Sequence, residues 1–385
     1  MPSTIRKKIL FISHESSLTG APVLLINLLK LIKQKELYDF EILLYRGGTL
    51  EKDFKELAPT STLKGCNYAT TKNMASRFIN YIGYRLKLKK WSKKVKQFDL
   101  VFSNTITNGK VLKALSHEGI PVISYVHELQ SVINQYWDDA YLTLQLSDVI
   151  AVPSSVVGNT LKLEYSVSEK KLSRLDYFFP INRGLLSSIT KQEARQKFLN
   201  KFQLSKEVFY VVSMGTATYR KGIDLFLEIC EELKSDLELF FVWMGDFVEE
   251  DTKRNVLSDC GALPDNLLIT GFLPHSFTNL LPFDLFCLSS REDPYPLVVV
   301  EAAIQKVPTL CFNSGGASEF VSDECGWLVE DFSPKAMAQK IKELKDSKKE
   351  IETVGNNAFN KAISLHANEE RIIFQFNSII KQVLT

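Results

Sequence analysis

The segment of the sequence with the clearest chemical content is SSREDPYPLVVVEAA, residues 289–303. An apolar run ends there in small polar residues, and a turn with Pro294 and Pro296 follows. We expect a helix to begin at once, because proline is tolerated at the first helical position. The amides of Leu297 and Val298 would then have no partner inside the helix. A helix N-terminus that follows a parallel strand is a ready site for an anion.

A carboxylate follows one turn further into this expected helix. Glu301 lies on the same face as Leu297, in a helix that is otherwise apolar. Burial of a carboxylate without partners is costly. A ligand with two adjacent hydroxyls, such as a ribose, would supply those partners. The alternative is a glutamate that reaches solvent or pairs with a buried arginine.

Two cations precede a second expected helix. In VVSMGTATYRKGIDLFLEI, residues 211–229, a strand leads through a glycine-containing loop, and Arg220 and Lys221 stand where the helix starts. Two cations beside free amides suit a diphosphate. The alternative is a basic pair on a solvated helix face.

Two loops in the N-terminal half also follow apolar runs. In SHESSLTGAPVLLINLL, residues 13–29, Gly20 would let the backbone approach a ligand closely, with a plain turn as the alternative. In SYVHELQ, residues 124–130, His127 and Glu128 would lie at the carboxyl edge of the sheet. A structural histidine is the alternative at that position.

The stretch from residue 63 to residue 98 contains ten basic residues and no acidic one, with Phe78, Tyr81, Tyr84 and Trp91 among them. Such a basic and aromatic segment can lie on an anionic membrane surface. The alternative is an exposed basic helix whose aromatic side chains pack inward. Nucleic acid is disfavoured as a partner, because the rest of the chain contains no nucleic-acid-binding module.

The bulk composition is that of a globular protein of about two domains. The chain has 385 residues, with 45% hydrophobic residues, 24% charged residues and a formal net charge of +2. No apolar run approaches the ~18 residues that a membrane span needs. No signal peptide is visible, so we expect a cytosolic or peripheral protein. The six cysteines form no C-x-x-C pair and no set with metal-ligand spacing.

The remaining pattern indicates which elements must position these residues. Short apolar runs alternate with helical stretches, which is typical of a parallel sheet covered on both faces. The first set of expected strands is KKILFIS, FEILLY, DLVFSN, PVISYV and DVIAVPS, with a helix over 21–35. After a pause around 176–206, the second set is VFYVVSMG, LELFFVWMG, NLLITGF, DLFCLSS and VPTLCFN, with helices around 221–234, 297–306 and 334–346.

The sequence therefore predicts an α/β protein with two doubly wound, Rossmann-like domains and ligands at the carboxyl ends of the strands. We expect one domain over 1–180 and the other over 190–366. The final segment EERIIFQFNSIIKQVL is an amphipathic helix with no strand after it. Its apolar face must be buried against one of the two domains.

The segment 289–303 resembles the E-x7-E motif of family 4 glycosyltransferases, also called group 1, which have the GT-B fold and retain the anomeric configuration. Asp293 and Glu301 occupy the two carboxylate positions, and Glu292 is an alternative for the first. In that family the first carboxylate contacts the donor sugar and the second binds the ribose. Since Pro296 has no N–H, the resemblance implies that the diphosphate and sugar are held by the amides of three residues, Tyr295, Leu297 and Val298.

A second match lies at the basic pair. Lys221 and Gly222 resemble the second-domain motif that neutralises the leaving nucleotide in this family. Thr216 stands where the family often has arginine, so Arg220 would supply that charge. The segment NSGGASEFV, residues 313–321, resembles the family's G-G-x-x-E segment.

Weaker matches complete the set. The loop with Gly20 resembles the family's glycine-rich first loop, although one glycine is present where two are usual. The resemblance implies that His127 hydrogen-bonds the donor sugar. It also implies that the loop with Phe272 and Leu273, in TGFLPHSF, meets the nucleotide base.

The resemblance implies two Rossmann-like domains that face each other across a cleft, with residues 368–385 packed back on the first. The first domain would bind a glycan or lipid-linked acceptor, and the second a UDP- or GDP-sugar. We expect a retaining hexosyltransferase of cell-surface polysaccharide biosynthesis, in the cytoplasm or on the inner face of the membrane. No metal or other cofactor is expected, because Arg220, Lys221 and helix dipoles would balance the diphosphate. The alternatives are a GT-B sugar-nucleotide epimerase and an inactive nucleotide-sugar-binding protein.

Overall fold

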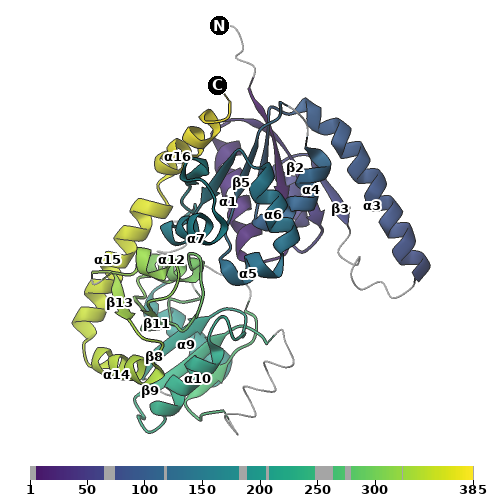
Figure 1. Cartoon of the computed structure of the whole chain (residues 1–385). Helices are drawn as coiled ribbons and strands as arrows, with labels where there is room; N and C mark the ends of the chain where they lie inside the picture. The colour runs from purple at the N-terminus through teal and green to yellow at the C-terminus, as the bar shows by residue number, and fades with distance from the viewer. Residues whose placement is uncertain are drawn as a thin grey trace. The chain divides into compact units, whose positions relative to one another are not determined.

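The computed structural model describes residues 6–64, 74–116, 119–181, 189–204, 208–247, 263–273, 279–322 and 324–384, without the side chains of 74–77. The chain forms two compact units (Figure 1). Unit 1 comprises Met1–Pro180 and Asn368–Thr385, and unit 2 comprises Ile181–Ala367. No helix in the described ranges is both long enough and apolar enough to cross a membrane.

Unit 1 contains a seven-stranded parallel sheet in the order β3-β2-β1-β4-β5-β6-β7. Its strands are β1 Lys8–Ser13, β2 Asp39–Arg46, β3 Thr60–Lys64, β4 Leu100–Asn104, β5 Val122–Tyr125, β6 Val149–Val152 and β7 Leu172–Arg174. Its helices are α1 Gly20–Gln34, α2 Glu51–Leu57, α3 Met74–Lys94, α4 Gly109–Leu115, α5 Gln130–Gln135, α6 Trp137–Leu146, α7 Ser155–Tyr165 and α16 Glu369–Lys381. Short 3-10 turns are η2 Val95–Gln97, η3 Ile106–Asn108 and η4 Glu169–Lys171.

The last helix, α16, buries its apolar face against the sheet of unit 1. The Phe376 ring lies 6.4 Å from the Phe11 ring of β1 and 5.7 Å from the Phe102 ring of β4, between centroids. At the polar edge of the same contact, the Arg371 guanidinium donates two hydrogen bonds to the buried Asp176 carboxylate, at 3.0 and 2.7 Å. The end of the chain is therefore part of the first core, although it follows the second.

Unit 2 contains a six-stranded parallel sheet in the order β10-β9-β8-β11-β12-β13. Its strands are β8 Phe209–Met214, β9 Leu239–Met244, β10 Leu267–Ile269, β11 Leu285–Leu288, β12 Thr309–Phe312 and β13 Gly326–Val329. Its helices are α9 Lys191–Phe202, α10 Ile223–Glu232, α12 Leu297–Ile304, α13 Ala317–Phe320, α14 Pro334–Lys345 and α15 Lys348–His366.

The strand order fixes where each unit can bind a ligand. In both sheets the order reverses at the first strand, between β1 and β4 in unit 1 and between β8 and β11 in unit 2. Open parallel sheets bind ligands at the carboxyl ends of the strands beside this reversal. In unit 2 the core behind that point is aromatic, since the Phe226 ring of α10 packs edge-on against Phe241 and Trp243 of β9.

The predicted fold class, two doubly wound α/β domains, is confirmed. All ten expected strands are present, and the five helices expected at stated residues are α1, α10, α12, α14 and α16, with ends shifted by a few residues. Among the described residues, the strands β3, β7 and β13 and the helices α9, α13 and α15 of the second half were not predicted. The helix α9 lies within the charged stretch of the expected pause at 176–206, and it buries only Ala194, Phe198 and Leu199.

Candidate functional site

Two loops at the carboxyl edge of the unit 2 sheet are joined by an ion pair. Lys221 lies in the loop after β8 and Asp293 in the loop after β11, and the Lys221 ammonium donates to the Asp293 carboxylate. Both side chains are largely removed from solvent, with 18% and 6% exposed. Between them, Gly222 has φ +70°, and a Cβ there would lie 2.0 Å from the Ser289 carbonyl oxygen. Only glycine therefore allows the two loops to meet this closely.

Arginines hold the same two loops together. The Arg220 guanidinium donates to the Glu292 carbonyl at 2.8 Å, and the Arg291 amide donates to the Arg220 carbonyl at 2.9 Å. The Arg291 guanidinium also donates two 2.7 Å hydrogen bonds to the Asp224 carboxylate, and these bonds raise the pKa of Arg291. It stacks 3.7 Å from the centre of the Tyr219 ring. Sequence reasoning passed over Arg291, although it stands inside the strongest motif.

A third loop, after β12, packs against the first carboxylate position. The Gly316 amide donates to the Asp293 carbonyl at 2.8 Å, and a Cβ at Gly315, which has φ +56°, would lie 2.0 Å from that same oxygen. The Ser314 hydroxyl donates to the Ser290 carbonyl at 2.7 Å. The Ser290 hydroxyl itself is buried and has no hydrogen-bond partner in the described part of the chain. A buried polar atom of this kind needs a partner that the protein does not supply.

The N-terminus of α12 provides the open part of this edge. Pro296 precedes the helix and gives no side-chain cap, so the Leu297 and Val298 amides have no partner within the helix. Burial raises the pKa of the Glu301 carboxyl to about 7. No hydrogen bond or ion pair of this carboxyl is found among the residues that the structure describes. An uncompensated carboxylate one turn behind free amides fits a ligand with both hydroxyl and anionic groups.

Tyr295 contributes its side chain to the interior rather than to the open edge. It is 4% exposed, and its hydroxyl lies 2.8 Å from Nε2 of His366, the buried last residue of α15. Only the backbone of Tyr295 is then left for a ligand. His366 lies far along the sequence in a segment without any motif, and sequence reasoning missed it.

The other predicted residues of unit 2 lie after β10, on the far side of β9. Phe272 is 55% exposed, and its amide donates to the Asp246 carboxylate at 3.0 Å. Leu273 follows it and is half-buried. Residues 274–278, the rest of the expected base-binding loop, lie outside the described residues.

In unit 1, His127 lies at the carboxyl end of β5 and is 7% exposed. Its Nε2 is 2.8 Å from the Asn104 side-chain oxygen, and its Nδ1 is 3.2 Å from the Tyr177 hydroxyl. Burial, with a smaller contribution from the charge of His14, lowers the pKa of His127 to about 3. The imidazole is therefore neutral at physiological pH, and both ring nitrogens already have protein partners.

The residues near His127 in unit 1 differ in burial and in whether their polar atoms have partners. The Glu128 carboxylate accepts the amides of His127 and Ile106 at 2.9 and 3.2 Å, while burial raises its pKa. Gly20 is the exposed first residue of α1. In the loop before it, Nδ1 of His14 and the hydroxyl of Ser16 are buried without a partner in the described ranges. The side-chain oxygen of Asn108, in the turn after β4, is likewise buried without a partner among the described residues.

The structure thus brings most predicted residues of unit 2 onto two adjoining loops and the start of α12, namely Arg220, Lys221, Asp293, Tyr295, Leu297, Val298 and Glu301. His127 and Gly20 belong to unit 1 and share the edge beside its own strand reversal. No group of three or more His, Cys, Asp or Glu side chains that could hold a metal ion is found within the described residues.

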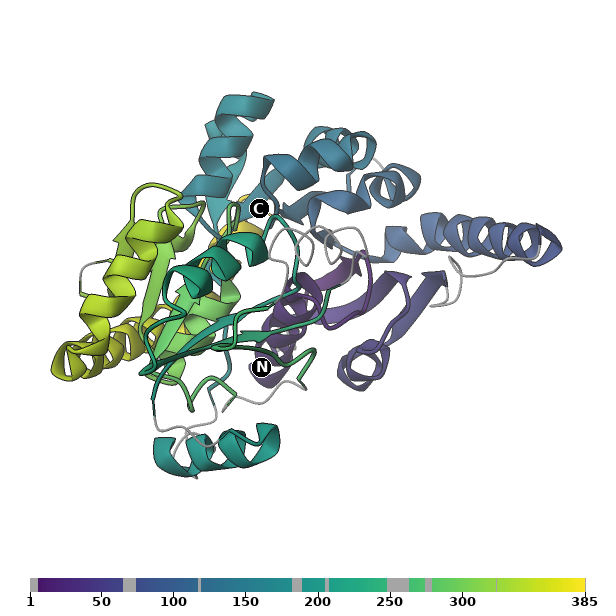
Figure 2. The same cartoon turned by 90° about the horizontal axis from the view of Figure 1, so that it is seen from below.

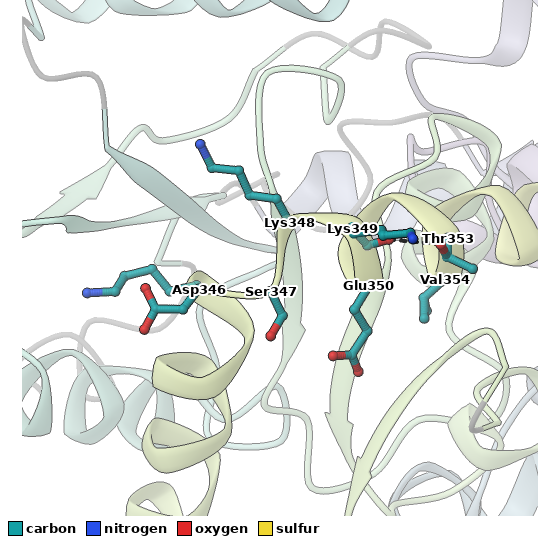
Figure 3. A pocket seen from close by; sticks show the side chains of 8 residues that line it. Asp346, Ser347, Lys348, Lys349, Glu350, Thr353 and Val354 are labelled. Carbon is teal, nitrogen blue, oxygen red and sulfur yellow. Dashed lines mark hydrogen bonds between the residues drawn. The ribbon is translucent and has the colours of Figure 1, made fainter.

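A separate pocket lies at the turn between α14 and α15, away from every predicted residue (Figure 3). Its lining includes Lys345, Asp346, Lys348 and Glu350, so charges of both signs surround it. The Lys345 ammonium is itself bonded to the Asp236 and Glu238 carboxylates at 2.9 and 2.7 Å. The charge of the Lys345 ammonium is therefore already neutralised by these two carboxylates. This turn thus differs from the carboxyl edge of the unit 2 sheet described above, where a buried carboxyl and hydroxyl have no partner among the described residues.

Comparison with known proteins finds a family model that matches the region containing this edge. Residues 194–361 match the family Glycosyl transferases group 1, which confirms the resemblance expected from the sequence. TuaC of Bacillus subtilis, named as a glycosyltransferase of teichuronic acid biosynthesis, is 27% identical over 194 residues, 50% of this chain and 47% of TuaC. The alpha-galactosylglucosyldiacylglycerol synthase of Streptococcus pneumoniae is 32% identical over 112 residues, 28% of this chain and 29% of the synthase. The chain thus spans less than half the length of these relatives.

Solved structures of similar fold cover nearly the whole chain. HepE of Anabaena, crystallised with UDP and glucose, has a TM-score of 0.79 at 17% identity, with 97% of this chain and 99% of HepE covered. The sucrose-phosphate synthase of Thermosynechococcus elongatus has a TM-score of 0.75, also at 17% identity, over 98% of this chain and 99% of the synthase. The chain therefore has the GT-B fold.

Proposed function

We propose that this chain, whose residues 194–361 belong to the Glycosyl transferases group 1 family, transfers a hexose from a UDP- or GDP-sugar to a glycan or lipid-linked acceptor with retention of anomeric configuration. Unit 2 would bind the donor and unit 1 the acceptor. The observation that carries this proposal is the half-buried, partnerless Glu301 carboxyl behind the open amides of α12. A ribose supplies two hydroxyl donors to such a group, and a diphosphate supplies the anion for the amides.

The diphosphate would lie where the two loops meet. Arg220 and Lys221 bring two cations to this place, and the N-terminus of α12 adds the amides of Leu297 and Val298. The Asp293 carboxylate, which pairs with the Lys221 ammonium, would also accept hydroxyls of the donor sugar. The Lys221 charge would then be shared between the carboxylate and the diphosphate.

In the reaction, the bond from the anomeric carbon to the diphosphate oxygen breaks and a bond to the acceptor hydroxyl oxygen forms on the same face. Negative charge grows on the leaving oxygen, and Arg220, Lys221 and the α12 amides stabilise it there. The acceptor proton passes to the departing phosphate. His127, neutral because of its low pKa, would act as a hydrogen-bond partner of the donor sugar rather than as a general acid.

The proposed acceptor class draws on relatives. TuaC is named for teichuronic acid biosynthesis, and LpsE of Rhizobium meliloti, 26% identical over 136 residues, is named for lipopolysaccharide core biosynthesis. Both names concern glycans of the cell envelope. We extend that role, cell-surface polysaccharide biosynthesis, to this chain as part of the proposal.

A two-step experiment tests the proposal. Thermal unfolding of the full chain is measured with a panel of UDP- and GDP-sugars, and the true donor should raise Tm because it binds only the folded state. That donor is then incubated with membrane glycolipid and polysaccharide extracts while the nucleoside diphosphate is assayed. Acceptor-dependent release, with an α-linked product from an α-linked donor by NMR, is the expected result. Binding without release would instead identify an inactive binding protein, and an inverted linkage would contradict retention.

A further inference from the structure

Helix α3 packs into unit 1 through one face only. Tyr84, Leu88 and Trp91 recur at helical spacing and lie against the core cluster that includes Val95, Phe98 and Leu112. Leu88 and Trp91 are 7% and 5% exposed. The helix extends away from the sheet of its unit (Figure 1, Figure 2). Phe78 and Tyr81 are 65% and 49% exposed, so the aromatic side chains do not all pack inward, as the alternative of a plain exposed basic helix requires.

The opposite face of α3 is apolar and open to solvent. Phe78, Ile82 and Leu86 follow one another at intervals of four residues, and they are 65%, 42% and 64% exposed. At about 100° per residue, Ile82 lies on the side of the helix opposite Trp91. Ile79 borders the row and is also exposed. Exposed apolar side chains gathered in one row differ from the scattered ones that every surface has.

Cations continue this same row toward the C-terminal end of the helix. Lys89 and Lys93 follow Leu86 at spacings of three and four residues, and Lys90 lies beside them, all exposed. No acidic partner of these three lysines is found in the described part of the chain. Lys94 is different, because its ammonium pairs with the Glu41 carboxylate and lies 4.5 Å from the centre of the Trp91 ring. Lys94 therefore serves the fold, and the free cations belong to the outer row.

We propose that this outer row of α3, residues Phe78, Ile82, Leu86, Lys89, Lys90 and Lys93, attaches the protein to an anionic lipid bilayer. Anionic headgroups match the three unpaired lysines, and the acyl boundary takes the apolar end of the row. A soluble polyanion would leave three large apolar side chains in water. A second copy of this helix would place its own unpaired lysines against these lysines, and the like charges would repel each other. A surface with both an anionic and an apolar layer provides partners for the three lysines and also removes the three apolar side chains from water.

The test uses the full chain and vesicles of phosphatidylcholine with or without phosphatidylglycerol, by co-sedimentation. We expect binding to the anionic vesicles at low salt and release at high salt. Lys89→Gln, Lys90→Gln and Lys93→Gln together should lower the partition coefficient by about 100-fold, since each lysine contributes about fivefold. The matched control carries the same three changes at Lys30, Lys113 and Lys170, which are exposed residues of the same unit. It should bind like the wild type.

A second pair of variants separates the bilayer from a soluble polyanion. Phe78→Ser, Ile82→Ser and Leu86→Ser should also weaken vesicle binding severalfold while leaving the charge intact. The control is Leu163→Ser with Phe374→Ser, which are 74% and 73% exposed elsewhere on unit 1. All substituted side chains are exposed, so unchanged thermal unfolding and circular dichroism verify the fold.

Three results would overturn the proposal: no binding of the wild type to anionic vesicles at low salt, equal losses in both lysine variants, or full binding by the serine variant. The last result would assign the row to a soluble polyanion. Self-association of the wild type that the serine variant abolishes, without vesicle binding, would assign it to a second copy. None of these outcomes depends on sugar transfer, so the proposed function stands or falls separately.

Discussion

The two sheets reverse their strand order at corresponding places, but the polar groups after β5 of unit 1 and after β11 of unit 2 differ in how far the protein itself satisfies them. At β5 of unit 1, His127 is bonded through both ring nitrogens and Glu128 accepts two backbone amides. After β11 of unit 2, the Glu301 carboxyl of α12 has no partner among the described residues, and neither has the buried Ser290 hydroxyl. The polar groups after β5 are therefore satisfied without a ligand, whereas those after β11 need one; in unit 1, unsatisfied atoms such as Nδ1 of His14 and the Ser16 hydroxyl lie in the loop after β1.

This difference separates polar residues whose protein partners fix a loop from polar residues whose partner would have to be a ligand. A buried polar group without a partner destabilises the protein by about 1–3 kcal/mol, which a ligand recovers when it binds. The ion pair of Lys221 and Asp293 belongs to neither class alone. The two charged groups are partners of each other, and Asp293 also precedes the start of α12, where the amides of Leu297 and Val298 have no partner within the helix. The experiments below test this division, from the largest expected effect to the smallest.

Lys221→Met should have the largest effect. The change removes a cation from the proposed leaving group, and loss of one such electrostatic contact lowers kcat by about 10²–10³-fold. It also leaves the buried Asp293 carboxylate without its cation, so unfolding free energy should fall by about 2–4 kcal/mol. Turnover of the donor and thermal unfolding measure the two effects.

A double variant separates those effects. Lys221→Met with Asp293→Asn removes both charges, so most of the lost stability should return while turnover stays low. Recovery of turnover along with stability would show that the pair only holds the loops, and the leaving-group role of Lys221 would have to be abandoned.

Glu301→Gln should weaken donor binding by about 10- to 100-fold, because the amide cannot replace a charged acceptor for two hydroxyls. The pKa of about 7 adds a pH signature. Below pH 7 the carboxyl is mostly protonated and accepts poorly, so wild-type affinity should rise between pH 6 and pH 8. Calorimetric titration of a nucleotide sugar, whose esterified diphosphate keeps its charge in this range, should show the rise only in the wild type.

The unliganded protein gives a second readout of the same carboxyl. Its pKa is about 7 when folded and near its ordinary value of 4.5 when unfolded, so the folded state binds the proton more tightly. The charged form therefore destabilises the fold above pH 7, and this cost disappears as the pH falls toward 4.5. Glu301→Gln should raise the unfolding free energy by about 1–2 kcal/mol at pH 8 and leave it unchanged near pH 5. Equal stability at pH 8 would mean that the carboxyl has a partner after all.

His127→Phe should have a smaller effect on chemistry. If His127 contacts the donor sugar, turnover should fall about tenfold while affinity for the free nucleoside diphosphate is unchanged, because that ligand has no sugar to contact. The pH–rate profile between 5 and 8 should not shift, because a group with a pKa of about 3 is neutral throughout. Tyr177→Phe, which removes only the partner of Nδ1, is the control. Lower stability with normal turnover per folded molecule would make His127 structural.

The sequence predicts the buried parallel strands because short, continuous apolar runs between helical stretches are typical of strands that are covered on both faces. It does not predict β3 and β7, whose residues TSTLK and LSR lie at the two ends of the sheet and are half exposed. The same limit applies to side-chain partners. Lys221 and Asp293 are each recognisable from a motif, but their contact depends on how two loops far apart in sequence converge, and His366 reaches Tyr295 only through the packing of α15.

The smallest expected effect is that of metal removal. A diphosphate leaving group needs positive charge, and enzymes that obtain it from a divalent ion lose turnover when the ion is chelated. Under the proposed function, Arg220, Lys221 and the amides of α12 would supply that charge without a metal ion. EDTA should therefore change turnover by less than about twofold, measured with nucleotide release and with dialysed enzyme as the control. If EDTA abolishes turnover and Mg²⁺ or Mn²⁺ restores it, the charge on these loops is insufficient. Lys221 would then be better described as the counterion of Asp293, and the two edges would differ less than their unpaired groups suggest.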